Sequence, residues 1–275
     1  MTMEAEKELF YLYCVADQAP LLKEGRDLFD HPFFVQHEGL YAVVSRVAGA
    51  KFDEENLKKN LCDLEWVKLH VITHEQVIED VMEHAGVVPF KFATLFKSFE
   101  SLKAMLAERA ALLKETLQKL RGLEEWGVKI YCDRERLRAS LSHDTEILEM
   151  DREIAASAPG KAFILKKKKE ALLDLKTAAK LNEHGQASFD LLRGLCARSR
   201  INKLLPKEVT EKTEDMILNA AFLIRTDGVR AFAEAVDGLK ARHEAGGLSF
   251  DRTGPWPPYN FCDFSVERAE AHGRP

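Results

Sequence analysis

Cysteine is scarce in this 275-residue sequence, and its spacing argues against both a disulfide framework and a zinc site. The five cysteines form no CxxC pair and are separated by tens of residues: Cys14, Cys62, Cys132, Cys196 and Cys262. Their number is odd, so a complete set of disulfides within the chain is excluded. This pattern predicts free thiols in a reducing compartment and no metal centre.

Long apolar runs are also missing. The best run, Ala220 to Ile224, is far shorter than the roughly 18 residues that a membrane span needs. The segment from Met1 to Glu8 is acidic and lacks the apolar stretch of a secretion signal. The formal net charge is only −5, so the total charge suggests neither nucleic acid nor a membrane surface as a partner. With 46% hydrophobic residues, the composition predicts a cytoplasmic, soluble globular protein.

Catalytic motifs are absent as well: the sequence has no GxGxxG, GxxxxGK[ST], GxSxG or HExxH. His70 and His74 have the i, i+4 spacing of metal ligands, but His74 lies in an apolar stripe and is better interpreted as a core histidine. An acid–base pair of His74 and Glu75 would require both side chains to line an open cleft. The sequence therefore predicts a protein that is not an enzyme and holds no cofactor.

The first half combines apolar runs with amphipathic segments. Strands are expected at 9–16, 40–47 and 87–96, where β-branched and aromatic residues cluster. Helices are expected at 53–61, after an Asp63 cap until Gly86, and after a Ser98 cap until Gly122. The chain between the first two strands is expected to be a loop.

The second half has the order strand, helices, strand, helix, strand. Strands are expected at 126–132, 216–225 and 248–253, with a possible short one at 208–212. A helix capped by Asp144 should end at Pro159-Gly160, a second should run from 161 to about 203, and a third from 226 or 227 to 242. This order matches the split βαββαβ pattern of ferredoxin-like domains.

Together these elements predict an α+β fold with two domains. Residues 1–123 should form an N-terminal domain with a small mixed or antiparallel sheet covered by helices. Residues 124–262 should form a C-terminal ferredoxin-like sheet with a long helical insertion at 144–204. Residues 263–275 are polar and are expected to be a flexible tail.

Positive charge is concentrated in the helical part of the second half. The segment from 160 to 207 contains 12 basic and four acidic residues, including the run Lys166 to Lys169. Four consecutive lysines spread around a helix, and no exposed aromatics interleave with them, so nucleic-acid binding is poorly supported. A solvated helix face is the default interpretation, and a docking surface for acidic protein partners is the alternative.

A proline-aromatic octet, Gly254 to Phe261, follows the last expected strand. Its three prolines stiffen the backbone and prevent full pairing in a central strand. The octet is either a terminal arm packed on its own domain or an arm that binds a partner through Trp256, Tyr259 and Phe261. The structural role is slightly favoured, with the binding surface elsewhere on the sheets.

Eight segments in order resemble the gas vesicle protein GvpF/GvpL family. They are Tyr11-Leu12-Tyr13, residues 39–45 (GLYAVVS), His74-Glu75-Gln76-Val77, residues 88–96 (VPFKFATLF), residues 125–129 (EWGVK), Ala158-Pro159-Gly160-Lys161, residues 218–223 (LNAAFL) and the octet at 254–261 (GPWPPYNF). The family usually has Arg-Phe-Gly where this chain has Lys91-Phe92-Ala93, and often glycine at Cys14. Without that glycine, Ala93 is expected to keep a negative φ.

The resemblance implies an accessory role in building gas vesicles. Family members are expected to combine an N-terminal α/β domain with a ferredoxin-like C-terminal domain. They are expected to bind the small hydrophobic shell protein (GvpA type) and other gas vesicle proteins, and to limit shell-protein aggregation during nucleation and growth. The expected location is the cytoplasm and, as a minor component, the vesicle. The alternatives are a small-molecule-sensing regulatory module and a hydrolase or transferase using His74 and Glu75.

Overall fold

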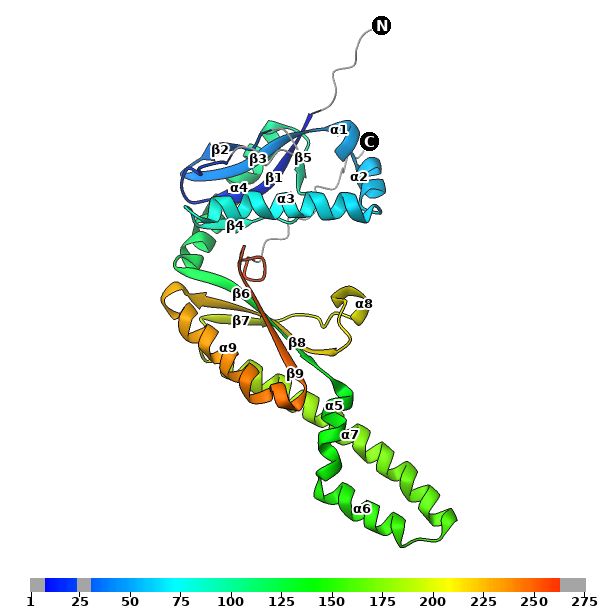
Figure 1. Ribbon diagram of the computed structural model, residues 1–275. Helices are drawn as coiled ribbons and strands as arrows, with labels where there is room; N and C mark the ends of the chain where they lie inside the picture. The colour runs from blue at the N-terminus through cyan, green and yellow to red at the C-terminus, as the bar shows by residue number, and fades with distance from the viewer. Residues whose placement is uncertain (1–7, 24–30, 263–275) are drawn as a thin grey trace. The chain divides into compact units, whose positions relative to one another are not determined.

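The computed structural model describes residues 8–23 and 31–262 (Figure 1). The chain is α+β, as predicted, and divides into two compact units, residues 1–124 with 256–275 and residues 125–255. Residues 256–262, which the sequence predicts to lie in the second domain, belong to the first unit. The expected tail from residue 263 lies outside the described residues.

The first unit contains an antiparallel sheet centred on β1 (Glu8–Ala16). The strands lie in the order β2 (Phe33–His37), β3 (Leu40–Ala48), β1 and β4 (Val87–Pro89), and β5 (Leu95–Phe96) also pairs with β1. The single strand expected at 87–96 is therefore two short strands separated by a turn. β2 was not predicted; it forms a hairpin with β3 through the two-residue turn Glu38-Gly39, where both φ angles are positive (48° and 80°).

Helices cover both faces of this sheet. On one face, α4 (Phe99–Leu120) packs Leu102, Leu106 and Leu113 against side chains that include Leu12 and Val44. On the other face, α1 (Gly49–Phe52) and α3 (Leu64–Met82) pack against Tyr11 and Tyr13, and the short α2 (Glu54–Asn60) joins the two helices. Burial on both sides explains why β1 is an almost continuous apolar run. The expected caps Asp63 and Ser98 both bind the first turn of their helices.

The second unit has the predicted ferredoxin-like strand order. Its strands follow the chain as β6 (Leu123–Cys132), β7 (Arg198–Ile201), β8 (Asp215–Arg225) and β9 (Leu248–Trp256), and they lie in the order β7-β8-β6-β9. α9 (Val229–His243) connects β8 to β9, and its Phe232 and Val236 share a core with Val128, Ile130 and Phe222. Two central strands with helical crossovers give the βαββαβ arrangement.

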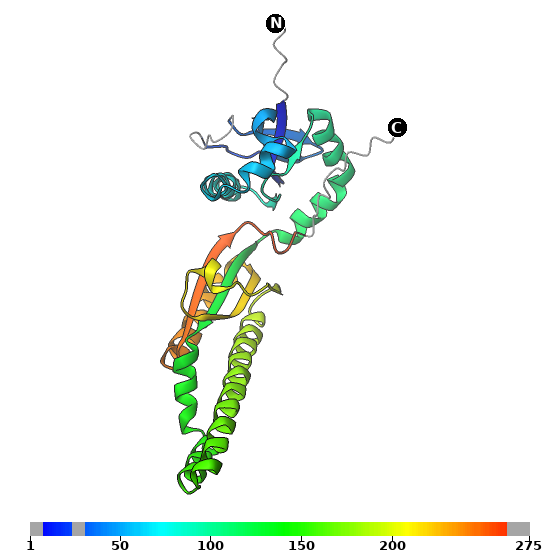
Figure 2. The same ribbon diagram turned by 90° about the vertical axis from the view of Figure 1, so that its right-hand side faces the viewer.

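A helical insertion connects β6 to β7. It contains α5 (Arg134–Ser140), a 3-10 turn at Leu141–His143, α6 (Thr145–Ala155) and the long α7 (Pro159–Arg193). Two further 3-10 turns, Thr226–Gly228 and Glu244–Gly246, lie on either side of α9. Figures 1 and 2 show α6 beside the first turns of α7, at the end of this unit farthest from its sheet. Gly185 permits α7 to approach β8 closely, because a Cβ there would lie 3.1 Å from the carbonyl oxygen of Ile217.

Three boundaries in the second unit differ from the prediction. Pro159 begins α7 instead of ending α6, which suits proline because the first helical N–H needs no partner. The helix expected to reach residue 203 ends at Arg193, and residues 198–201 form strand β7. The short strand expected at 208–212 is instead the single-turn helix α8 (Lys207–Thr210).

Candidate functional site: the C-terminal aromatic segment

The octet begins at a glycine that no other residue can replace without strain. Gly254, near the end of β9, has φ of +134°, and a Cβ at this position would lie 2.9 Å from the carbonyl oxygen of Glu125. It would also lie 3.1 Å from the ring of Trp126, so the side chains and backbone of β6 fill the space. Backbone approach of this kind is a use of glycine that sequence alone does not distinguish from a turn.

Beyond Trp256 the segment folds onto the first unit. The amide of Tyr259 donates to the carbonyl of Pro257 (2.7 Å), and the amide of Phe261 donates to that of Pro258 (3.1 Å), which makes a tight coil. The ring of Phe261 is only 4% exposed. Tyr259 is half-buried against the apolar cluster between α3 and the sheet. The segment is therefore anchored on the first unit rather than on the domain that precedes it.

Tyr259 meets two polar side chains of α3. Its hydroxyl donates to Oε1 of Glu75 (2.9 Å) and lies 3.0 Å from Nε2 of His74. Burial raises the pKa of the Glu75 carboxyl, and the hydrogen bond from Tyr259 acts in the opposite direction. Burial and the neighbouring Glu75 raise the pKa of Tyr259, so the phenol stays protonated as a donor.

His74 links this contact to the central strand. Nε2 lies 3.1 Å from the carbonyl oxygen of Phe90, which can only accept, so the proton of the neutral ring belongs on Nε2. Nδ1 then accepts from the hydroxyl of Tyr11 at 2.8 Å. Burial lowers the pKa of His74 to about 4, which keeps the ring neutral near pH 7.

The Tyr11 hydroxyl in turn accepts from the amide of Ala93 at 3.1 Å. Ala93 has φ of +62°, so the prediction of a negative φ at this position is wrong. The backbone keeps the left-handed turn between β4 and β5 because its amide is held by Tyr11 and the next strand pair begins directly after it. The alanine therefore bears a steric cost that glycine would not.

The three predicted partner-binding residues differ in accessibility. Trp256 is 39% exposed, whereas Phe261 is buried and Tyr259 is held by α3. No sequence pattern connects them with Tyr11, His74, Glu75 or Ala93. A signal was available, because four of the segments that carry the family resemblance (11–13, 74–77, 88–96 and 254–261) meet at this place.

His74 is a core side chain, as predicted, and His70 on the same helix is also buried. His74 is fully buried with both ring nitrogens engaged, so the acid–base hypothesis, which required an open cleft, is wrong for this pair. His70 is 8% exposed; its ring stacks on Trp66 at 3.8 Å, and Nδ1 lies 2.7 Å from the Trp66 carbonyl oxygen. The arrangement is a buried network that joins four segments, and its chemistry is that of anchoring.

Comparison with known proteins decides the family. The model of the family described as gas vesicle synthesis protein GvpL/GvpF matches residues 9–263. The chain belongs to the GvpL/GvpF family. Membership gives it a role in the gas vesicle system.

Relatives of both family branches are similar over most of the chain. Gas vesicle protein L of a Streptomyces species is 25% identical over 247 residues, which covers 86% of this chain and 85% of that protein. Gas vesicle protein F1 of Halobacterium salinarum is 25% identical over 271 residues, covering 97% and 98%. The crystal structure of GvpF from Anabaena has the same fold, with a TM-score of 0.71, 22% identity and coverage of 94% and 99%.

Among residues 8–23 and 31–262, no helix is both long and apolar enough to cross a membrane.

Proposed function

We propose that this GvpL/GvpF family protein is a gas vesicle assembly factor that binds the hydrophobic shell subunit and limits its aggregation before and during vesicle growth. The physical need is simple. A shell subunit with an apolar gas-facing surface must be covered in the cytoplasm until it is incorporated. The protein would act there as a non-enzymatic accessory protein and, as a minor component, at the growing vesicle.

The observation that carries the proposal is the edge strand β2 in the first unit. Among the described residues, β2 pairs only with β3, so its outer backbone groups face away from the sheet. Phe34 on this strand is 43% exposed and lies edge-on to Tyr41, with ring centroids 5.6 Å apart. A sheet edge with an exposed aromatic side chain suits the addition of an extended apolar segment.

The register of the hairpin identifies the amides that would bind the added strand. His37 and Leu40 flank the two-residue turn, so they exchange hydrogen bonds, and bonded pairs then alternate along the ladder. The amides of Phe34 and Gln36 consequently point away from β3. Gln36 is exposed, so its side chain can be changed without touching the core.

Proline at this position gives a direct test. Gln36→Pro removes an outward amide and leaves the β2–β3 bonds in place, while Gln36→Thr is the matched control. We expect Gln36→Pro to reduce the amount of shell subunit that co-purifies at least tenfold, and Gln36→Thr to retain it. The proposed function fails if the wild-type protein never associates with the shell subunit, alone or with other vesicle proteins. The edge-strand site fails if Gln36→Pro binds as the wild type does.

Trp256 is proposed as a second contact. Its exposed ring could anchor a partner, and Trp256→Ala should then weaken association with the shell subunit by more than about 1 kcal/mol. If Trp256→Ala lowers only the melting temperature, the ring is part of the structural anchor that includes Tyr259 and Phe261.

A further inference from the structure

We propose that the outward face of α7, together with a hollow at its base, is a docking surface for an acidic amphipathic helix of a partner protein. This surface lies in the second unit, far along the chain from β2, and does not depend on the proposed shell-protein site. It consists of the apolar stripe Ile164, Ala171, Leu175 and Ala178, the flanking Lys167 and Lys168, and the hollow described below.

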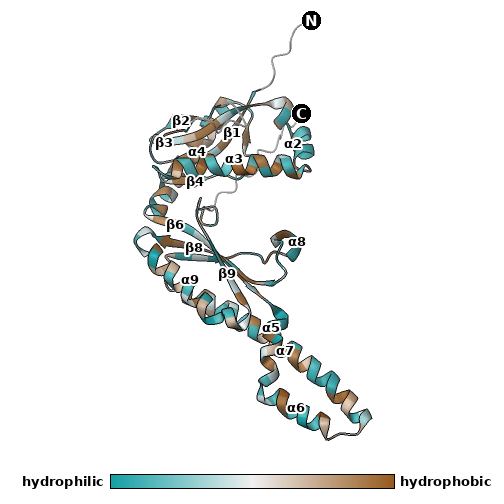
Figure 3. Cartoon of the chain, in the orientation of Figure 1, coloured by the Kyte–Doolittle hydropathy of each residue, from teal (hydrophilic) through white to brown (hydrophobic). Residues whose placement is uncertain are grey.

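The stripe follows from helix geometry. Its residues are separated by seven, four and three positions, which places them along one side of an α-helix. Ile164 is 57% and Leu175 is 68% exposed. Leu165, Leu173 and Thr177 point to the other side, where α7 packs against α5, α6 and β8. The inner face of α7 thus already has its partners, and the stripe is a second apolar face; brown and teal segments alternate along this helix (Figure 3).

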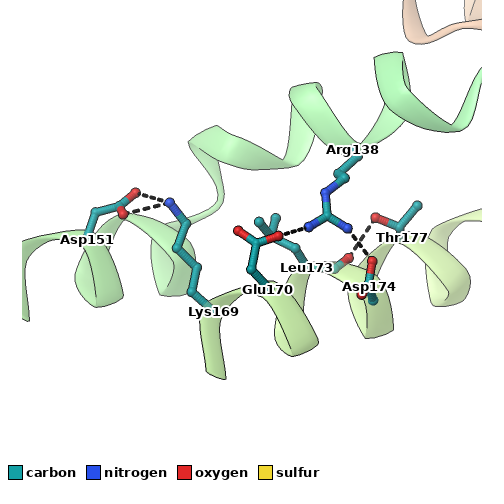
Figure 4. A network of polar contacts seen from close by, with 7 residues as sticks. All are labelled: Arg138, Asp151, Lys169, Glu170, Leu173, Asp174 and Thr177. Atoms are coloured by element: carbon teal, nitrogen blue, oxygen red, sulfur yellow. Dashed lines mark hydrogen bonds and ion pairs between the residues drawn. The ribbon is translucent and has the colours of Figure 1, made fainter. Parts of the chain in front are cut away.

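Ion pairs within the insertion engage the acidic residues of this part of α7. Figure 4 shows Arg138 of α5 reaching Glu170 and Asp174, and Lys169 reaching Asp151 of α6. Two other lysines of α7 also form ion pairs within the insertion: Lys176 with Asp144 and Glu146, and Lys161 with Glu153. Glu170 and Asp174, the two acidic residues between 161 and 175, therefore both have an ion-pair partner, and they share the single positive charge of Arg138.

Two lysines beside the stripe are left over. Lys167 and Lys168 are exposed and form no ion pair with any described residue. The ammonium of Lys167 lies 4.8 Å from the ring centroid of Phe163, which is itself 60% exposed. These two lysine charges outweigh the one negative charge left in excess where Arg138 pairs with both Glu170 and Asp174, so the balance along the stripe is positive. Its complement is a helix with acidic flanks.

The stripe continues into a hollow of about 420 Å³. It lies between α7, the start of α5 and the segment 204–217, and Ala178, Leu181, Leu204, Met216 and Ile217 supply its apolar lining. Arg134, at the start of α5, lines it too and forms no ion pair with a described residue. From Ile164 to Asn182, at the hollow, α7 rises by roughly 27 Å, the length of a helix of about 18 residues.

The shape of the α7 surface favours a helix over other binding partners. Ala171 and Ala178 are small, so a second helix can approach α7 closely at these positions. The larger side chains of Ile164 and Leu175 can then pack between side chains of that helix. The apolar stripe is about one side chain wide, which suits the seam between two helices. Nucleic acid would match the lysines but would leave Ile164 and Leu175 without apolar contacts.

The test uses two synthetic helical peptides of 21 residues. Both have Leu and Ile at the seam positions; one has Glu and the other Lys at the flanking positions. We expect the acidic peptide to bind the full-length protein at least tenfold more tightly than the basic peptide does, as measured by fluorescence anisotropy. The affinity of the acidic peptide should fall as the salt concentration rises. Equal binding of both peptides would overturn the proposal.

Variants locate the binding on the protein. We expect two variants to bind the acidic peptide at least tenfold more weakly: Leu175→Glu, and the double variant Lys167→Glu with Lys168→Glu. Leu112→Glu is the matched control, because Leu112 is a 47% exposed leucine on α4 of the first unit. Circular dichroism and thermal unfolding identify any variant that does not fold. Unchanged affinity in the folded α7 variants would overturn the assignment.

Two further outcomes would assign the surface to another occupant. If the protein binds anionic lipid vesicles but not the acidic peptide, and Leu175→Glu abolishes the vesicle binding, the surface binds a membrane and not a partner helix. If the protein forms a dimer that Leu175→Glu dissociates, the surface binds a second copy of this chain.

Discussion

Replacing Ala93 with glycine should stabilise the protein, although alanine-to-glycine changes usually do the opposite. Ala93 has φ of +62° in the turn between β4 and β5. An L-residue in this conformation brings Cβ close to the following carbonyl oxygen, at a cost of about 1.5 kcal/mol that glycine avoids. The amide that donates to the Tyr11 hydroxyl is kept in Ala93→Gly, so the polar network is unchanged.

Two smaller effects oppose this gain. Glycine adds conformational freedom to the unfolded chain, which costs about 0.7 kcal/mol. Loss of a half-buried methyl group costs about 0.4 kcal/mol. The net stabilisation is about 0.4 kcal/mol, or a rise of roughly 1 °C in melting temperature for a unit of this size.

A matched control makes this small effect measurable. Ala107 is an exposed alanine inside α4 of the same unit, and Ala107→Gly should destabilise the protein by about 1 kcal/mol. Both changes add the same freedom to the unfolded chain, so the difference between them, about 1.4 kcal/mol in urea unfolding, reports the folded backbone. If Ala93→Gly destabilises the protein as much as Ala107→Gly does, the left-handed backbone at Ala93 carries no steric cost.

The elements that the sequence predicted well are those whose residues specify them locally. β1, β3 and β8 are apolar runs that pack on both faces, and their boundaries agree with the prediction to within a residue or two. α3 and α4 begin at Asp63 and Ser98, whose side chains bind the first helical amides. In these cases pattern and capping indicate the same structure.

The elements that were missed depend on partners distant in the sequence. Residues 198–201 are Arg-Ser-Arg-Ile, which have no strand pattern of their own, but they pair with Ala220 to Leu223 of β8. β2 lies between Pro32 and Gly39 and resembles a loop until β3 is placed beside it. Tertiary pairing overrides local preference in both.

The candidate site shows the same limit. The prolines and aromatics of the octet mark Trp256, Tyr259 and Phe261 as candidate residues, but nothing local indicates that Tyr259 meets His74, 185 positions earlier. At Ala93 the residue type itself was misleading, because the left-handed backbone is imposed by Tyr11 and the adjoining strands rather than by a glycine. Long-range hydrogen bonds, which sequence patterns do not encode, fixed both positions.

Three further predictions concern the second unit and the anchoring network. Gly254→Ala should destabilise the protein by at least about 2 kcal/mol in urea unfolding, because its Cβ would meet the Glu125 carbonyl, whereas Gly238→Ala, in open space on α9, should be neutral or stabilising. Tyr259→Phe should cost about 1–2 kcal/mol, and unchanged stability would contradict the role of its hydroxyl. His74 has a folded pKa of about 4 against an ordinary 6.5, so the unfolded chain binds the extra proton as the pH falls between these values. The contribution of His74 is therefore complete above pH 6.5 and should fall by about 2 kcal/mol by pH 5. The raised pKa of Glu75 opposes this loss, since protonation of Glu75 favours the folded state. His74→Gln, which cannot titrate, should flatten the dependence between pH 7 and pH 5, and an equally steep slope in His74→Gln would assign the effect to other groups.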